Sequence, residues 1–173
     1  MTATTASVRL TPGRWTSMPE RTEAAFTVGN LGRTVRGTIQ VVSGTVHVAD
    51  DGRPVAVRAE LDLRTVATGH TRRDADLRKD RLLDSEAHPT MTVTCDEVRA
   101  EGLGWRSDGR LALRGTDCPL SVTGVLAEDS RPDCVHVLAT AVLDRTAVGI
   151  RAPRLLIGRT VTIAVDAWLS APG

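Results

Sequence analysis

The sequence predicts an all-β fold, namely an eight-stranded antiparallel barrel with a short helical insertion. Three observations lead to this prediction. Apolar and polar residues alternate in about eight short segments. Clusters of Gly, Asp, Ser and Pro lie between or beside these segments, and one charged segment, 70–88, lacks Gly and Pro. The 173 residues fit one domain, which we place over 1–173.

The clearest strand signal lies at residues 55–63. Val57 and Leu61 fall on one face and Arg58 on the other, because successive side chains of a strand point to opposite sides. One wetted face favours an antiparallel sheet over a parallel sheet that is covered on both sides. The same alternation recurs at 24–28, 35–48, 91–95, 111–113, 120–124, 135–143 and 161–169.

Turn residues favour direct connections between consecutive strands. We expect turns at 43–44, 50–52, 101–104, 108–109 and 131–133, where Gly supplies positive φ and Asp, Ser or Pro presets turn geometry. An up-and-down meander is the simplest topology that these connections allow. A sheet of about eight strands leaves two unpaired edges unless it closes into a barrel, so closure is predicted.

Segment 70–88 interrupts the alternation. Asp74 and Arg78 lie one helical turn apart, as do Asp76 and Lys79, so a short helix with a solvated face is expected. The apolar residues of this segment are few, and we expect it to cap the barrel as a lid instead of joining the core. They are Ala75, Leu77, Leu82 and Leu83.

The interior of such a barrel has few bulky side chains to fill it. Aromatic residues make up 2% of the chain, and the expected inward residues are mostly Val, Ala, Leu and Gly. An apolar cavity is therefore predicted, and an apolar ligand is the hypothesis for its occupant. The flexible thioether of Met91 suits a variable ligand, although plain gap-filling explains it equally well. The residues predicted to line the cavity are Phe26, Val28, Leu61, Leu63, Met91 and Val93.

Two arginines are candidates for binding an anionic head group. Arg36 and Arg145 stand beside glycine-containing strand ends, where a guanidinium could hold an anionic head such as pyrophosphate in bidentate fashion. The alternative for each is an internal ion pair or a solvated surface charge.

The sequence lacks the patterns typical of catalysis or metal binding. There is no G-x-S-x-G, no phosphate-binding glycine loop and no C-x-x-C, and the four histidines, His47, His70, His88 and His136, show no metal-ligand spacing. We therefore expect no enzyme, cofactor or metal. A barrel enzyme would require a titratable pair buried inside, such as Asp166 or Asp62 facing a histidine, and the alternation places Asp62 outward.

Charge and hydropathy narrow the partners. A formal net charge of +1 and few aromatic residues argue against nucleic acid. No apolar segment is long enough for a secretory signal or a membrane span, so a cytoplasmic protein is expected. The expected partner is an apolar lipid or isoprenoid, and the choice between monomer and homodimer stays open.

Five short motifs, in this order, resemble the YceI-like family of polyisoprenoid-binding, lipocalin-like proteins. They lie at 13–15 with 25–37, at 68–89, at 109–120, at 144–150 and at 157–161, so the resemblance covers about 13–169. It implies a lipocalin-like barrel whose interior takes up a long isoprenoid or similar lipid tail, with the polar head near the mouth and no catalysis.

This chain departs from the family pattern at three places. Arg21-Thr22 stands where a His-Ser pair is expected, Asp76 stands where the insertion usually carries a histidine, and the barrel has fewer aromatic residues. The identity of the ligand is therefore left open. A ligand-free barrel that acts as a protein interaction or stress-related module is the alternative function.

Overall fold

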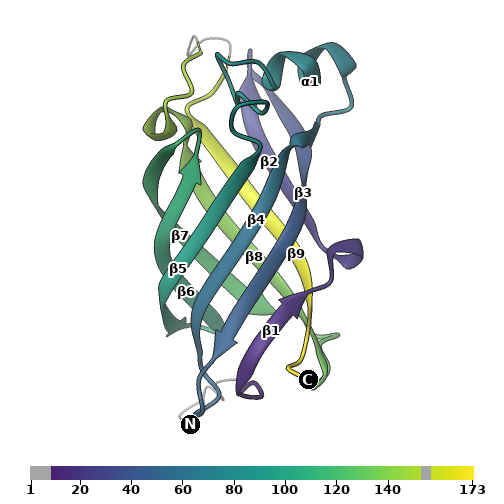
Figure 1. The fold of residues 1–173 in the computed structure, drawn as a ribbon, viewed down its shortest axis with the longest axis vertical. Helices are drawn as coiled ribbons and strands as arrows, with labels where there is room; N and C mark the ends of the chain where they lie inside the picture. Colours follow the sequence, from purple (N-terminus) through teal and green to yellow (C-terminus); the bar gives the residue numbers. More distant parts are fainter. Residues whose placement is uncertain (1–8, 153–156) are drawn as a thin grey trace.

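The eight predicted strands form a closed antiparallel barrel in a computed structural model that describes residues 9–152 and 157–173 (Figure 1). Each strand pairs with the next one along the chain, and the first of them, β2, pairs with the last, β9. The meander and its closure are thus confirmed. The strands are β2 (Glu23–Asn30), β3 (Arg33–Val48), β4 (Pro54–Ala67), β5 (Thr90–Glu101), β6 (Gly104–Leu113), β7 (Thr116–Leu126), β8 (Cys134–Asp144) and β9 (Thr160–Ser170).

A further short strand, β1 (Gly13–Ser17), was not predicted. It pairs with residues 45–48 of β3 and 169–170 of β9, whereas β2 pairs with residues 33–39 and 161–166 of the same two strands. The two short strands therefore share one position in the barrel wall, separated by the 3₁₀ turn η1 (Pro19–Arg21). Alternation could not reveal β1, because its five residues include Trp15 as the sole large apolar side chain.

Two of the predicted turns are wrong, because residues 43–44 and 108–109 lie inside β3 and β6. Gly109 is required by a close approach and not by a turn. A Cβ atom there would lie 2.6 Å from the Cys95 sulfur, opposite a register shift in β5. Gly44 likewise faces Ser17, whose Cβ would be 3.2 Å from an added methyl group.

The insertion forms the helix α1 (Thr71–Leu77) and a series of turns at one end of the barrel, here called the upper end (Figure 1). The predicted helix and its Asp76–Lys79 pair are present, with Nζ to Oδ1 at 2.6 Å. The expectation that the insertion stays out of the core is wrong for Leu82, which is buried in the main apolar cluster. Leu77 and Leu83 pack against the same cluster.

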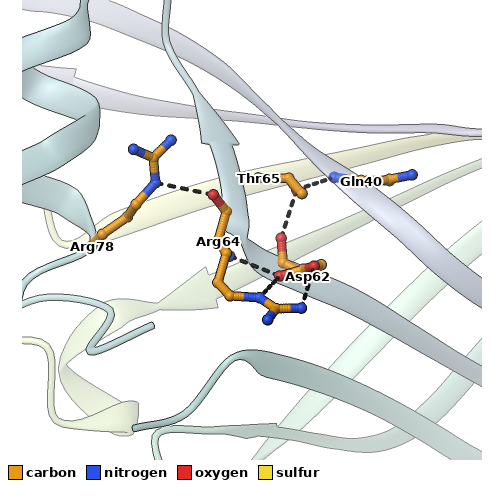
Figure 2. Close-up of polar contacts among 5 residues, drawn as sticks. All are labelled: Gln40, Asp62, Arg64, Thr65 and Arg78. Atoms are coloured by element: carbon orange, nitrogen blue, oxygen red, sulfur yellow. Dashed lines mark hydrogen bonds and ion pairs between the residues drawn. The ribbon is translucent and has the colours of Figure 1, made fainter. Parts of the chain in front are cut away.

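Polar contacts fix the insertion to β4 (Figure 2). The Arg78 guanidinium at the end of α1 donates from Nε to the carbonyl oxygen of Arg64 at 3.0 Å. Asp62 accepts bonds from the backbone N–H and Nε of Arg64, both at 2.9 Å, and these bonds lower the pKa of Asp62. Thr65 donates to the Asp62 carbonyl and accepts from the backbone N–H of Gln40. This network stabilises the place where β3 and β4 shift register.

Two apolar clusters line the interior of the barrel. The larger cluster includes Leu63 and Leu111 and reaches the insertion, while Trp15, Val48 and Leu169 belong to a smaller one at the lower end, where β1 lies. Within 9–152 and 157–173, no helix has both the length and the apolar character needed to cross a membrane.

Candidate functional site

Three apolar cavities follow one another inside the barrel. The upper cavity, of about 110 Å³, lies beneath the insertion and shares Leu61, Met91 and Ile163 with the middle cavity, of about 150 Å³. The lower cavity, of about 110 Å³, shares Val57 and Val137 with the middle one. Because neighbouring cavities share walls, they form one line between the two ends of the barrel.

The barrel is hollow because its inward side chains are small. Val57, Ala59 and Val93 point inward and line the middle cavity, yet each is only half-buried, since its free surface faces empty space inside the protein. Close packing elsewhere in proteins leaves few voids larger than a water molecule. The scarcity of aromatic residues in the sequence thus has a direct structural result.

The six residues predicted to line the cavity all face the interior. Phe26, Val28, Leu61, Leu63 and Met91 line the upper cavity, and Val93 lines the middle one. Other wall residues were not among the six predicted to line the cavity. Two of them lie on the apolar face of β9, which the alternation identified, and three are leucines of the insertion. The missed residues of the upper cavity include Ile39, Val66, Leu77, Leu82, Leu83, Leu113, Leu143, Val161 and Ile163.

Arg145 lies in the wall of the upper cavity and is buried, with 3% of its surface exposed. Its guanidinium donates to four carbonyl oxygens, those of Ile150, Ala152, Ile157 and Gly158, at 2.8–3.0 Å. No carboxylate contacts it within the described part of the chain. Arg145 therefore places a positive charge beside the cavity and holds the segment that follows it.

Arg36 lies elsewhere, on the outer face of the barrel. Its side chain is 69% exposed and one guanidinium nitrogen lies 3.8 Å from a carboxylate oxygen of Glu23. It borders an outer groove and not the apolar cavities. The structure therefore separates the two arginines that the sequence analysis had grouped as head-group candidates.

Trp15 is a large side chain in the wall of the lower cavity. The indole is 1% exposed, packs against Val48, Val135 and Leu169, and donates from Nε1 to the carbonyl oxygen of Thr11 at 2.9 Å. Because the polar edge of the ring has a partner, the ring can be buried at low cost. Trp15 thus lies at the lower end of the line of cavities, and the insertion lies over the upper end.

A histidine does face Asp166, but on the outer surface. Val137 and Val165 point into the cavities, so their neighbours His136 and Asp166 point outward. His136 Nε2 lies 2.7 Å from Asp166 and Nδ1 lies 2.7 Å from Asp129. Partial burial lowers the pKa of His136, but hydrogen bonds to both carboxylates outweigh this effect and raise it above its usual value.

Stacking completes this outer cluster. The His136 ring lies on Trp168 with ring centroids 4.4 Å apart, and the Arg21 guanidinium lies 3.8 Å from the Trp168 ring. The cluster connects η1, β8 and β9. Both imidazole nitrogens have carboxylate partners, so the arrangement fits a structural imidazolium better than a general base.

The walls of the cavities contain few groups that could take part in catalysis or bind a metal ion. Among the described residues, Arg145 is the one ionisable group in the wall of the upper cavity, and no set of three His, Cys, Asp or Glu side chains is placed to hold a metal ion. A closed eight-stranded barrel has an interior that is either filled by side chains or wide enough for one small ligand, and the cavities place this chain among the barrels with a hollow apolar interior.

Comparison with known proteins identifies the family. The sequence pattern of the YceI-like domain matches residues 15–169, and the chain belongs to this family. UPF0312 protein ECA1782 of Pectobacterium atrosepticum and Protein YceI of Escherichia coli are each 30% identical over 104 residues, which is 58% of this chain and 54% of each relative. The chain thus spans about half the length of the curated relatives it matches.

Solved structures share the fold. BcnA of Burkholderia cenocepacia has a TM-score of 0.79 at 12% identity, over 90% of this chain and 99% of BcnA. A domain from Saccharophagus degradans, described as polyisoprenoid binding, has a TM-score of 0.63 at 16% identity, over 91% of this chain and 98% of that domain. The barrel is therefore a shared architecture at low sequence identity.

Proposed function

We propose that this protein binds, and carries or sequesters, an isoprenoid-like or fatty lipid inside its barrel, without catalysing a reaction. The observation that carries the proposal is the line of three apolar cavities, which share walls from the insertion down to Trp15. An extended hydrocarbon tail matches a site that is long, narrow and apolar. The polyisoprenoid-binding description of the Saccharophagus degradans domain supports the same class of ligand.

Burial of the tail supplies the affinity. Each methylene group removed from water contributes about 0.8 kcal/mol, so a long tail needs few polar contacts to bind tightly. The flexible Met91 side chain lies between the upper and middle cavities and can adapt to tails of different shape. We therefore expect selectivity for length and apolar character more than for a particular tail.

Native mass spectrometry, followed by organic extraction of the purified protein, tests the proposal directly. We expect a lipid to be recovered, and an apolar fluorescent dye to bind the delipidated protein. Failure of both would contradict the proposal and favour the alternative of a ligand-free interaction module.

A pair of matched variants locates the binding. Val93→Phe adds a ring inside the middle cavity, while Val142→Phe adds the same ring on the outer face, where Val142 is 62% exposed. We expect dye affinity to fall by about tenfold or more in Val93→Phe, a change of about 1.4 kcal/mol, and to stay unchanged in Val142→Phe. Equal affinities in the two variants would place the dye outside the barrel.

We also propose that the protein works in the cytoplasm. Cys95, Cys118 and Cys134 are free thiols, which suits a reducing compartment. Burial raises the pKa of the Cys95 and Cys118 thiols, so both are poorly reactive. Cell fractionation tests the location, and light scattering tests whether the chain forms the homodimer left open by its sequence. Each chain contains a full line of cavities, so binding does not require a second copy.

A further inference from the structure

A pocket lined by both apolar and charged residues adjoins the upper cavity on its solvent side. This vestibule has a volume of about 320 Å³, and its inner wall is shared with the upper cavity. The shared residues are Phe26, Val28, Leu77, Leu82 and Ile157. A molecule whose tail occupies the upper cavity therefore has its other end at or near this vestibule.

The outer wall of the vestibule is positively charged. It contains three guanidinium groups, those of Arg72, Arg73 and Arg81, against the single carboxylate of Asp76. Asp76 is already paired with Lys79, whose Nζ lies 2.6 Å from its Oδ1. Lys79 thus already balances the one negative charge in the wall, and the positive charges of the three arginines are in excess.

The three arginines differ in how firmly they are held. Arg73 is fixed by two bonds to Thr68, from Nε to Oγ1 at 2.8 Å and from a terminal nitrogen to the carbonyl oxygen at 3.1 Å. Arg81 approaches Asp76 only to 3.9 Å. Arg72 is exposed and forms no ion pair within residues 9–152 and 157–173. The other twelve residues of the chain contain no Asp or Glu that could pair with it. Arg72 and Arg81 therefore keep donors for a ligand.

A charged head group cannot follow its tail into the barrel. Moving an ion into the apolar cavity would cost far more than the tail gains, so the head must stay at the vestibule. Guanidinium groups bind carboxylate and phosphate oxygens in bidentate fashion, and such charge-assisted bonds are about twice as strong as neutral ones. The buried charge of Arg145 in the cavity wall favours the same sign of head group.

We propose that the vestibule selects lipids with an anionic head, a carboxylate or a phosphate, and that Arg72 and Arg81 are its specificity-determining residues. This inference rests on the proposed function, because the tail must lie in the barrel for the head to reach the vestibule. Lipids of equal tail length with a neutral head, such as alcohols, bind more weakly. In the sequence, this site is marked by two adjacent arginines near the start of the insertion. Strand alternation could not assign them to a site, because the insertion has no strand period.

The test compares three probes with the same tail: hexadecanoic acid, hexadecyl phosphate and hexadecanol. Each displaces an apolar dye from the delipidated full-length protein at low salt. We expect the two anions to bind about tenfold more tightly than the alcohol, and this preference to shrink as salt screens the charges. Equal affinity for the acid, the phosphate and the alcohol would overturn the proposal.

Matched double variants assign the preference to the vestibule. Arg72→Gln with Arg81→Gln should reduce the affinity for both anions and leave that for hexadecanol unchanged. Arg53→Gln with Arg99→Gln removes the same charge from exposed positions outside the vestibule, where the side chains are 75% and 62% exposed, and should leave the affinity for all three probes unchanged. An equal loss in both double variants would mean that net charge, and not the vestibule, sets the preference.

Two further outcomes separate the sources of failure. Inorganic phosphate alone should not displace hexadecyl phosphate at millimolar concentration, and displacement would identify a free anion, not a lipid head, as the occupant. If the dye and all three probes fail to bind, the proposed function itself fails together with this inference. If the dye binds and the alcohol binds as tightly as the anions, the proposed function stands and the inference falls.

Discussion

The ring of Phe26 lies across Gly37 on the neighbouring strand, inside the barrel. The two residues are directly paired between β2 and β3, and a Cβ atom on Gly37 would overlap the edge of the ring, with Cε1 at 2.6 Å. Glycine is required here by the space that the ring occupies, since its backbone φ is not positive. The single Phe of the chain thus packs over the backbone of Gly37 in the wall of the upper cavity.

Gly37→Ala should therefore displace the Phe26 ring toward the cavity. We expect a loss of about 1–3 kcal/mol in the free energy of unfolding, as for other overpacked cores, together with weaker dye binding. Urea unfolding and dye titration measure the two effects. Gly29→Ala is the control on the adjacent strand, because a Cβ atom added there would have no other atom within 4 Å. An equal loss in both variants would rule out the steric explanation.

Trp15→Ala should open the lower end of the line of cavities. Removal of a large buried aromatic side chain costs about 3–5 kcal/mol of stability, and water or dye would gain access from below. Stopped-flow measurements should show faster dye release than in Trp15→Phe, which keeps a ring in place. Unchanged release in Trp15→Ala would show that ligands pass only through the upper end.

Arg145→Leu should loosen the segment after β8 by leaving four carbonyl oxygens without their donor. Each buried polar group left unsatisfied costs about 1–3 kcal/mol, although some of these oxygens can turn toward water. Hydrogen exchange should accelerate at 145–152 and 157–159. Arg145→Lys should restore little, because an ammonium group cannot reproduce the planar fork of donors. Full protection in the lysine variant would contradict this reasoning.

The outer histidine predicts a pH dependence of stability. The pKa of His136 is raised in the folded protein, so protonation stabilises the fold. This contribution is complete below the unfolded pKa of about 6.5 and is lost as the pH rises through the folded value. His136→Gln should therefore cost more stability at acidic than at alkaline pH, by an amount on the order of 1 kcal/mol. A cost independent of pH, measured by urea unfolding, would mean that folding leaves the pKa of His136 unchanged.

Alternation identified the strands because each strand of the barrel has one face toward the interior and one toward solvent. Leu61 and Leu63 on one face of β4, with Arg58 and Glu60 on the other, have the period that a closed antiparallel sheet imposes. Where that period is broken, the sequence can mislead. Gly109 looks like a turn residue in the sequence, but it is a glycine because the neighbouring strand β5 approaches it closely. Composition predicted the hollow interior, since few side chains could fill it.

Sequence reasoning identified the wall of the site better than its entrance. Phe26 and Met91 are placed in the cavity by strand period alone, but Arg72 and Arg81 come from an insertion with no such period. Their position depends on how the turns after α1 fold back, which is determined by tertiary contacts such as that of Arg78 with Arg64. Arg36 and Arg145 look alike in the sequence and differ only once the barrel closes.

The pairing of β2 with β9 joins residues from the two ends of the barrel sequence, such as Glu23 and Asp166. Contacts so distant along the chain form late, because the entropy of closing a long loop must be overcome first. During synthesis, the strands from β2 to β8 can assemble only as an open sheet with two free edges. The cavity comes into being when β9 arrives, so lipid uptake would follow folding, and a bound lipid would report that the last strand is in place.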